Sequence, residues 1–379
     1  MWCMMYESSD ALRAFLHGLQ TGGIFFYKAL WSILFGVAVT AAIDVFVDKD
    51  RMARLLGGRD VKTIGLAAAT GAASSACTFG AVTISQALYK KGASVESTFA
   101  FALASTNIVF ELSVLIYVLL GGAILAAEFL SGVLLVVLMT ILVRLTLPVR
   151  MFERARQDLQ ARDTGTPAAM RRLVDAGLWY RIADRFFRTL KRIWKSVVFG
   201  FLAAGFIAAL VPSHAWPVLF LRPTNFPAVL ENAAVGVAVG ALSFIGSIGI
   251  VPFAAALAIG GVAFPGVVGC IVADLITIPV LNVWRRYFGN KATAYILVIF
   301  YTAMVSSTVL ITYLFRLGGW LPSRIEAGRL ATFRVRLDYT LVLTLLFLGL
   351  TLTLWLAKRK GEARSLVGPP GLRGRARGD

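Results

Sequence analysis

The sequence predicts an all-α polytopic membrane protein, and three observations lead to this fold class. Of its 379 residues, 58% are hydrophobic and only 15% are charged, unlike the mixed composition of a soluble domain. Apolar stretches of about 20 residues, the length of a membrane-spanning helix, recur from Phe25 to Ala357. The excess of 38 Lys and Arg over 20 Asp and Glu lies between these stretches and at the carboxyl end, as positive-inside topology requires.

Seven apolar windows read as single membrane-spanning helices. They cover residues 25–47, 97–119, 123–147, 194–213, 263–284, 292–314 and 339–357. Two further segments, 63–90 and 229–260, would be roughly 42 and 48 Å long as continuous helices, well beyond a ~30 Å hydrocarbon core. Each is also interrupted near its middle by Gly, Ser or Pro. We therefore interpret both as broken, re-entrant hairpins.

The two broken segments are related to each other in sequence. "GAVTISQALYKKG" (Gly80–Gly92) aligns without a gap on "GIVPFAAALAIGG" (Gly249–Gly261). The same shift along the chain relates Gly36 to Gly205 and Ser105 to Asp274. The order of one span, one broken segment and two spans also occurs twice. The sequence thus predicts two repeats of about four elements each, followed by a carboxyl-terminal helix.

Basic residues indicate how the two repeats are oriented. The linker sequence "MRRLVDAGLWYRIADRFFRTLKR" is expected in the cytoplasm. If both broken segments are re-entrant hairpins, the cytoplasm also contains the loops "DKDRMARLLGGRDVK", "YKKG" and "RRYFGNK" and the tail "KRKGEAR". If both segments instead cross the membrane once, "RRYFGNK" and the tail lie outside. The hairpins make the halves inverted repeats, which are typical of secondary transporters. Residues 315–338 disagree, because their five arginines would then be external.

This interpretation divides the chain into seven segments. They are an N-terminal segment 1–24, a first membrane repeat 25–147, a basic cytoplasmic linker 148–193, a second membrane repeat 194–314, a loop 315–338, a final transmembrane helix 339–357 and a basic tail 358–379. No cleavable signal peptide is expected, because Arg13 is the only basic group in the first segment.

Polar and small residues at the two breaks form the candidate substrate site, since irregular backbone at membrane depth must face protein or a water-filled cavity. The candidates are Ser75, Cys77, Thr78, Gly80 and Asn107 in the first repeat and Ser247, Gly249 and Pro252 in the second. Exposed helix ends bind anions through amides or cations through carbonyls. Close helix packing by small residues is the alternative.

Two carboxylates are the candidates for proton coupling or ion binding. Glu111 and Asp274 lie near the middle of their predicted spans, where a carboxylate costs about 2.5–3.5 kcal/mol. Asn107, four residues before Glu111, is expected on the same helix face. The alternative role is structural, with hydrogen bonds from neighbouring Ser, Thr or Asn. Three carboxylates closer to span ends are expected at the membrane interface: Asp44, Glu128 and Glu231.

Cys77 is the candidate metal ligand, because a thiolate binds soft metals and metalloids. A buried cysteine that only fills apolar space is the alternative. The three cysteines, Cys3, Cys77 and Cys270, are too scattered for a disulfide framework or a CxxC metal site. No Walker loop is present either. The chain is therefore expected to use no cofactor and no ATPase activity of its own.

These segments resemble the bacterial predicted-permease family that includes the organoarsenical efflux permeases. The resemblance rests on "CTFGAVTISQALYKKGASVESTFAFALASTN" and "GSIGIVPFAAALAIGGVAFPGVVGCIVADLITIPVLNVWRRYFG", and covers most of residues 25–314. It implies a cytoplasmic-membrane permease and, for some members, export of trivalent organoarsenicals. Ser75 and Phe79 occupy the family's proline and second cysteine positions. The residues of this chain that match the family's motifs by position are Cys77, Gly80, Gly92, Asn107, Gly249, Pro252, Ala273 and Asp274.

We therefore predict an inner-membrane permease that moves a small solute by alternating access and is not an enzyme. Efflux of a metalloid or metal-linked compound is one option for the solute. The expected partners are the lipid bilayer and the solute or ion, without nucleic acid, and a homo-oligomer stays open. One alternative is an intramembrane enzyme acting on a lipid-linked substrate, although no base is visible near Cys77. Another is a non-transporting scaffold that docks partners through residues 148–193.

Overall fold

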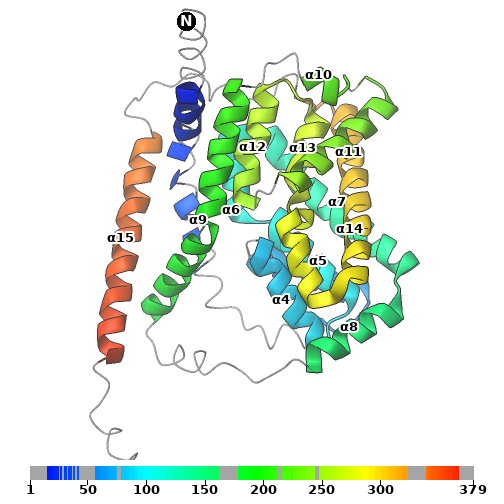
Figure 1. Ribbon diagram of the computed structural model, residues 1–379, viewed down its shortest axis with the longest axis horizontal. Helices are drawn as coiled ribbons and strands as arrows, with labels where there is room; N and C mark the ends of the chain where they lie inside the picture. Colours follow the sequence, from blue (N-terminus) through cyan, green and yellow to red (C-terminus); the bar gives the residue numbers. More distant parts are fainter. Residues whose placement is uncertain are drawn as a thin grey trace, which may run out of the picture.

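The computed structural model describes residues 15–41 with gaps at 25, 28–29, 32, 36 and 39–40, followed by 56–74, 78–161, 178–210, 216–243 without 223, 247–322 and 339–366. Every regular element within these ranges is a helix. The helices form a bundle, with α15 standing at one edge beside α9 (Figure 1). The predicted all-α membrane fold class is confirmed.

The first half of the bundle contains helices α3 to α7. They are α3 (Val61–Ser74), α4 (Thr78–Lys90), α5 (Val95–Asn107), α6 (Phe110–Leu120) and α7 (Gly122–Thr146). Asp60 stabilises the start of α3 because it accepts hydrogen bonds from the hydroxyl (2.5 Å) and the amide (3.0 Å) of Thr63. These bonds hold the pKa of Asp60 below its usual value. Gly92 and Gly121 follow α4 and α6 with φ of 111° and 84°, a region that glycine alone enters without strain.

The second half repeats these elements along the chain. The shift that places Gly80 on Gly249 also carries the bounds of α4 onto those of α12 (Ser247–Ile259). It carries the bounds of α5 onto those of α13 (Phe264–Val272) together with the 3₁₀ turn η3 (Ala273–Ile276). Helix α11 (Phe226–Leu242) corresponds to α3, and α14 (Ile278–Leu317) corresponds to α6 and α7 joined. Gly121 (φ 84°, ψ 175°) and the kink residue Gly289 (φ 81°, ψ 170°) mark the same joint.

Further helices lie around the two halves. They are α8 (Val149–Ala161), α9 (Leu178–Leu210), α10 (Trp216–Leu219) and α15 (Tyr339–Leu366). Helix α9 begins inside the stretch predicted as the basic linker and packs along α12 and α15. Asp184 of α9 forms ion pairs with Arg188 and, at 3.5 Å, with Lys358 of α15. These charges join α15 to the bundle near its carboxyl-terminal end.

The first broken segment returns to the end of the bundle where it began. A Cβ added at Gly57, ahead of α3, would lie 3.6 Å from the carbonyl oxygen of Gly92, just after α4. The amide of Ser94 donates to the carbonyl of Leu56 at 3.2 Å, and its hydroxyl donates to the carbonyl of Gly58 at 3.0 Å. At ~20 Å each, α3 and α4 are also shorter than a ~30 Å hydrocarbon core. They are two arms of a hairpin.

The second broken segment follows the same path. Phe220, ahead of α11, contacts α13, because a Cβ added at Gly266 would lie 2.9 Å from its ring. Farther along, Gly236 of α11 lies against the backbone of Gly266, and a Cβ at Gly240 would lie 2.5 Å from the carbonyl oxygen of Cys270. Helices α11 and α13 therefore start at the same end and run alongside each other, so α11 and α12 also form a hairpin.

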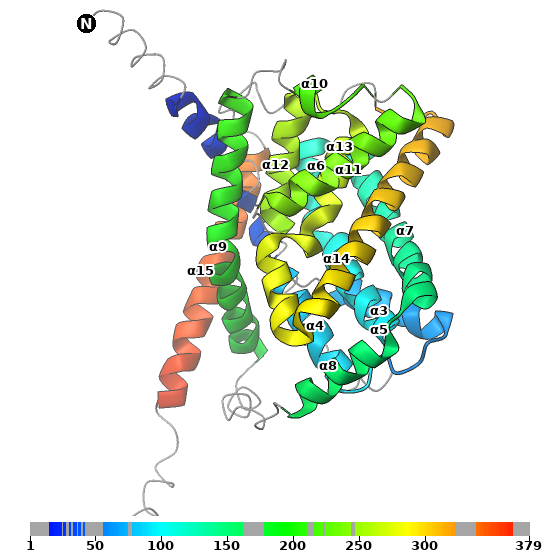
Figure 2. The ribbon, with the colours of Figure 1, turned by 45° about the vertical axis from the view of Figure 1, so that its right-hand side comes forward.

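The two hairpins are based at opposite ends of α14. Tyr89, at the end of α4, packs on Phe288, with ring centroids 5.4 Å apart. Phe264, at the start of α13, packs on Phe315, also at 5.4 Å. In both ribbon views α8, beside the first base, lies at the bottom and α10, beside the second, lies at the top (Figures 1 and 2). The hairpins thus extend toward each other from opposite ends.

Two spans that the sequence predicted as continuous are broken. Within the described part of the chain, Gly122–Thr146, Phe264–Leu317 and Leu341–Arg359 are long and apolar enough to cross a membrane. The predicted span 97–119 bends by 42° between α5 and α6, and the predicted span 263–284 contains the turn η3. Each repeat therefore has two breaks in its helices, where the sequence predicted one.

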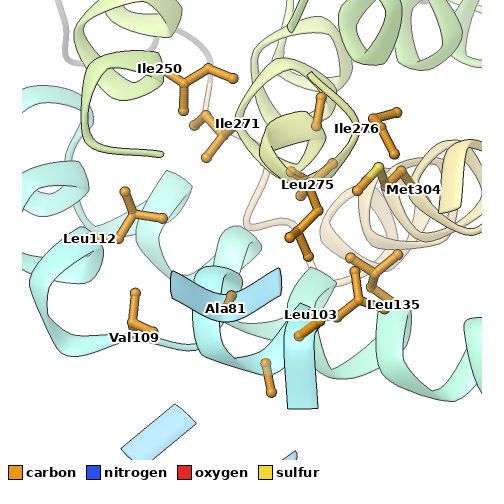
Figure 3. Packing of buried hydrophobic residues seen from close by; sticks show 14 of the residues in the cluster. Ala81, Leu103, Val109, Leu112, Leu135, Ile250, Ile271, Leu275, Ile276 and Met304 are labelled. Carbon is orange, nitrogen blue, oxygen red and sulfur yellow. The ribbon is translucent and has the colours of Figure 1, made fainter. Parts of the chain in front are cut away.

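The hydrophobic core lies where helices of the two halves meet. Leu103 of α5, Leu135 of α7, Leu275 of η3 and Met304 of α14 converge there and are fully buried (Figure 3). Helix α14 packs on α7, α11 and α13, so it contacts both halves along its length. The core thus joins the two repeats into one packed unit and surrounds the breaks of α5 and α13.

Adding a methyl group at Gly71 tests the close packing of α3 on α5. Its Cβ would lie 2.5 Å from the carbonyl oxygen of Phe101, whereas a Cβ at Gly65 on the same helix meets nothing within 4 Å. Gly71→Ala should therefore lower stability by about 1–3 kcal/mol and reduce the melting temperature in detergent. Gly65→Ala should leave it unchanged or raise it by up to ~1 kcal/mol. Equal melting temperatures for the two variants would contradict this packing.

Candidate functional site

Thr78 and Asp274 bring the two repeats into contact in the buried interior. Thr78 begins α4 directly after the break in the first hairpin, and Asp274 lies in η3. The two residues are 2% and 1% exposed. The Thr78 hydroxyl donates to Oδ2 of Asp274 at 3.4 Å, a long hydrogen bond. Both residues were predicted as site residues, and the structure brings them together.

The backbone at Asp274 is held by side chains of its own segment. Helix α13 ends at Val272, and α14 starts after Thr277, which is extended (φ −62°, ψ 148°). A break of this kind leaves carbonyl groups without helical partners. The Thr277 hydroxyl donates to the carbonyl of Asp274 at 3.4 Å, and the Trp284 indole donates to the carbonyl of Leu275 at 3.3 Å. These bonds fix the turn that presents the carboxyl group.

Asn107 occupies the corresponding break of the first repeat. It ends α5, is 2% exposed, and its amide nitrogen donates to the Leu103 carbonyl at 3.0 Å and to the Thr106 hydroxyl at 3.1 Å. The prediction that Asn107 and Glu111 share one helix face is wrong, because α5 ends at Asn107 and Glu111 belongs to the bent helix α6. The side chain of Glu111 lies outside the described part of the structure.

Glu128 is a buried carboxylate, so its predicted place at the membrane interface is wrong. It lies in the second turn of α7 and is 2% exposed, because α5, α13 and α14 pack on this helix. Neither of its carboxylate oxygens has a hydrogen-bond partner among the described residues. Asp274 directly follows α13, which packs on the helix that carries Glu128. By contrast, Glu231 is half-buried and accepts a hydrogen bond from the Leu221 amide at 3.1 Å. Asp44 lies outside the described residues.

The sequence around Glu128 does contain a signal of burial. Ala127, Ser131 and Gly132 form a cluster of small residues beside it on α7, a pattern typical of close helix packing in membranes. Ser131 and Ser307 of α14 have their hydroxyl oxygens 2.5 Å apart, and a Cβ added at Gly132 would lie 3.3 Å from Cβ of Asn107. The small residues thus bring α5 and α14 close to the helix that carries Glu128.

The predicted glycine and proline candidates lie in packed helices. A Cβ added at Gly200 of α9 would lie 2.6 Å from Cα of Gly249, so Gly249 serves close packing of α12 on α9. Gly80 is half-buried in α4, and Pro252 is buried inside α12. Ser247 begins α12, but its side chain is not among those described. The structure does not bring Gly80, Gly249 or Pro252 into the contact between Thr78 and Asp274.

The predicted metal ligand lies outside the described residues. Cys77 and Ser75 fall between α3 and α4, in residues 75–77. Elsewhere in the described ranges, no three His, Cys, Asp or Glu side chains gather into a group that could hold a metal ion. The polar groups buried near the breaks are the Thr78 hydroxyl in contact with the Asp274 carboxyl, the Asn107 amide and the Glu128 carboxyl. Such groups bind polar solutes and exchange protons.

Comparison with known proteins identifies related sequences. A family model described as "Predicted permease" matches residues 19–315. The chain is 34% identical over 318 residues to "Putative permease Rv2963" of Mycobacterium tuberculosis. The aligned region covers 80% of this chain and 78% of that protein. No solved structure matches the chain. The matched region contains both hairpins and all of the residues that meet in the buried interior.

A double-mutant cycle on Ser131 and Ser307 tests the contact that holds α7 against α14 beside Glu128. We expect a coupling of about 0.6–1.5 kcal/mol between Ser131→Ala and Ser307→Ala, the range for hydrogen bonds between membrane helices. Unfolding in mixed detergent micelles measures it. Thr140→Ala is the control, because the Thr140 hydroxyl bonds only within α7, to the Val136 carbonyl. Strictly additive effects of the two serine substitutions would contradict the contact.

Proposed function

Because the chain belongs to the predicted permease family and is a membrane transporter, we propose that it moves a small solute across the bacterial cytoplasmic membrane by alternating access. The buried contact between Thr78 and Asp274 carries this proposal, since it joins the tip of the first hairpin to the break of the second repeat. The solute would bind there, between the two halves.

The arrangement of the hairpins supports alternating access. Each hairpin returns to the end where it began, and the two bases lie at opposite ends of α14. A solute at their meeting point is separated from either surface by one repeat. Rocking of one repeat against the other would then open the site to each side in turn, as in transporters built from inverted repeats.

Asp274 is the proposed coupling group of this transporter. A carboxylate inside a membrane protein is costly and is retained where it pairs, relays protons or binds a substrate. Asp274 is 1% exposed and accepts a hydrogen bond from a residue that follows the first break. Protonation would neutralise it while the halves move, and release of the proton would leave it charged for the next cycle. Glu111, on the neighbouring helix α6, is the second proposed coupling group.

For the solute, we propose a small metalloid or metal-linked compound that leaves the cell. Cys77 directly precedes Thr78 in sequence, so its thiol and the Thr78 hydroxyl belong to the same hairpin. A thiol favours soft, thiophilic centres, whereas hydroxyl and amide groups hold oxygen-bearing ligands. A trivalent methylarsenical carries both kinds of group, which makes it a suitable first probe. Ser75, Gly80 and Asn107 of the first repeat and Ser247, Gly249 and Pro252 of the second remain proposed contributors to this site.

Transport of methylarsenite tests the coupling group and the thiol separately. In everted membrane vesicles energised by respiration, the parent chain should accumulate methylarsenite. Asp274→Asn should abolish the part of the uptake that collapses with the proton gradient, because an amide cannot exchange a proton. Cys77→Ser should reduce uptake at low methylarsenite concentration while leaving its proton dependence in place.

Glu231→Gln is the matched control, since this carboxylate is half-buried near the start of α11 and already has a hydrogen-bond donor in the Leu221 amide. It should transport like the parent. Unchanged proton-dependent uptake in both Asp274→Asn and Glu111→Gln would refute coupling by these groups. Absence of methylarsenite uptake by the parent would refute only the solute class.

Sided labelling tests the inverted placement of the two hairpins. Single cysteines at Lys91 and Gly260, in a chain with its three native cysteines replaced by serine, should react with a membrane-impermeant maleimide from opposite faces. Lys91 should react from the cytoplasm and Gly260 from outside. A cysteine at Asn290 should react on the same side as Lys91, because it follows the α14 kink beside the first base. Labelling of Lys91 and Gly260 from one face would refute the inversion.

A further inference from the structure

Glu128 is a buried carboxylate that no step so far uses. Glu128 is 2% exposed, and both of its oxygens lack a hydrogen-bond partner within the described ranges. A buried ionised carboxylate needs a cation, a metal or several hydrogen-bond donors, and otherwise takes up a proton. The polar surroundings of Glu128 therefore decide which of these ligands it takes.

Each helix that packs on α7 contributes polar or ionisable groups. From α5 these are Asn107, near Glu128, and Glu96, which lies 3.9 Å from Arg59 at the other end. From α6 they are Tyr117, which is 62% exposed, and Glu111, whose side chain lies outside the described part of the structure.

Helices α13 and α14 contribute further polar groups along the length of α7. From α13 and η3 come Cys270, which is buried, and Asp274. From α14 come Tyr301, whose hydroxyl donates to the carbonyl of Ala234, and Tyr295, whose hydroxyl pairs with Thr146. Asp274 thus places a second buried carboxyl group next to a helix that packs on α7, and its charge when ionised has the same sign as that of Glu128.

A second buried atom without a hydrogen-bond partner lies about one helical turn along α7 from Glu128. Oδ1 of Asn107 is buried without a hydrogen-bond partner in the part of the chain that the structure describes. Asn107 faces Gly132, which is one helical turn from Glu128 on the same face of α7. A protonated carboxyl group has a hydroxyl that can donate a hydrogen bond, and an amide oxygen accepts one. Protonation of Glu128 would therefore supply the donor that the Asn107 oxygen lacks and would remove the unpaired charge.

We propose that Glu128 and Asp274 form a proton-binding carboxyl pair, in which Glu128 is the inner proton acceptor of the transporter proposed above. A proton moves from water to a carboxylate oxygen of Glu128, which converts the carboxylate to a neutral carboxylic acid, and returns to water on release. No electron is transferred. Two nearby carboxylates of like charge share protons more readily than they ionise together. A divalent metal is disfavoured, because no third acidic, histidine or cysteine ligand joins them among the described residues.

Infrared difference spectroscopy of the purified full-length protein tests this pair without any transport measurement. A pH jump should produce a carbonyl band of a carboxylic acid that shifts in heavy water. Glu128→Gln should remove that band, and Asp274→Asn should change the pH midpoint of the band that remains. Glu231→Gln, the half-buried carboxylate with its own hydrogen-bond donor, should leave the spectrum unchanged.

Three outcomes would overturn the proposal. The first is a Glu128→Gln spectrum identical to the parent spectrum, and the second is an Asp274→Asn midpoint equal to the parent midpoint. The third is loss of the acid band on addition of Na⁺ but not of choline, which would assign the pair to a metal cation. If Glu128→Gln fails to fold by size-exclusion chromatography, Glu128→Asp serves instead and should shift the band. These spectra are recorded without a solute. They can therefore refute the carboxyl pair without refuting the proposed transport function, and the transport assay can refute that function without refuting the pair.

Discussion

The structure depends on one constraint of the membrane interior, which is that backbone amides and carbonyls outside regular helices must be covered by protein or water. Each repeat breaks its helices twice, between the arms of its hairpin and again after α5 or α13. Glycines allow the helices to pack closely enough to cover these breaks. Gly71 lets α3 contact the backbone of α5, and Gly240 lets α11 contact the backbone of α13. The hairpins are thus held against the helices whose breaks they help to bury.

That constraint also concentrates polar side chains in the core. Helix breaks need donors and acceptors nearby, and Thr277 and Trp284 supply donors at the second break. The same place holds Asp274, and Glu128 lies on α7, which packs on the helix that leads into this break. A carboxyl group in such a position interacts with bound protons and solutes far more strongly than one in water, because little solvent screens it. The breaks that the fold must cover are therefore also the place where transport chemistry is proposed.

Sequence reasoning located Thr78 and Asp274 correctly as interior residues, because polar groups within apolar spans avoid lipid and find their partners inside the bundle. It failed at Glu128 because burial of a helix end depends on which neighbours cover it, and depth along a span does not report this. It also failed for Asn107 and Glu111, since the break between α5 and α6 falls in "TNIVFEL", where no Gly or Pro marks it. Gly249, predicted as a site residue, also lies in close packing contact with Gly200 of α9, which hydropathy does not reveal.

The sequence by itself determined the all-helical membrane class, the repeat and the hairpin segments, because hydrophobic length, charge distribution and the ungapped match of Gly80–Gly92 to Gly249–Gly261 are properties of the chain's order. It left open which helix faces meet. Only the tertiary structure decided that the hairpin bases lie at opposite ends of α14, that Thr78 reaches Asp274 in the other repeat, and that α5, α13 and α14 enclose Glu128. The physical reason is that helices in lipid associate through shape and a few polar contacts, and hydropathy does not encode these.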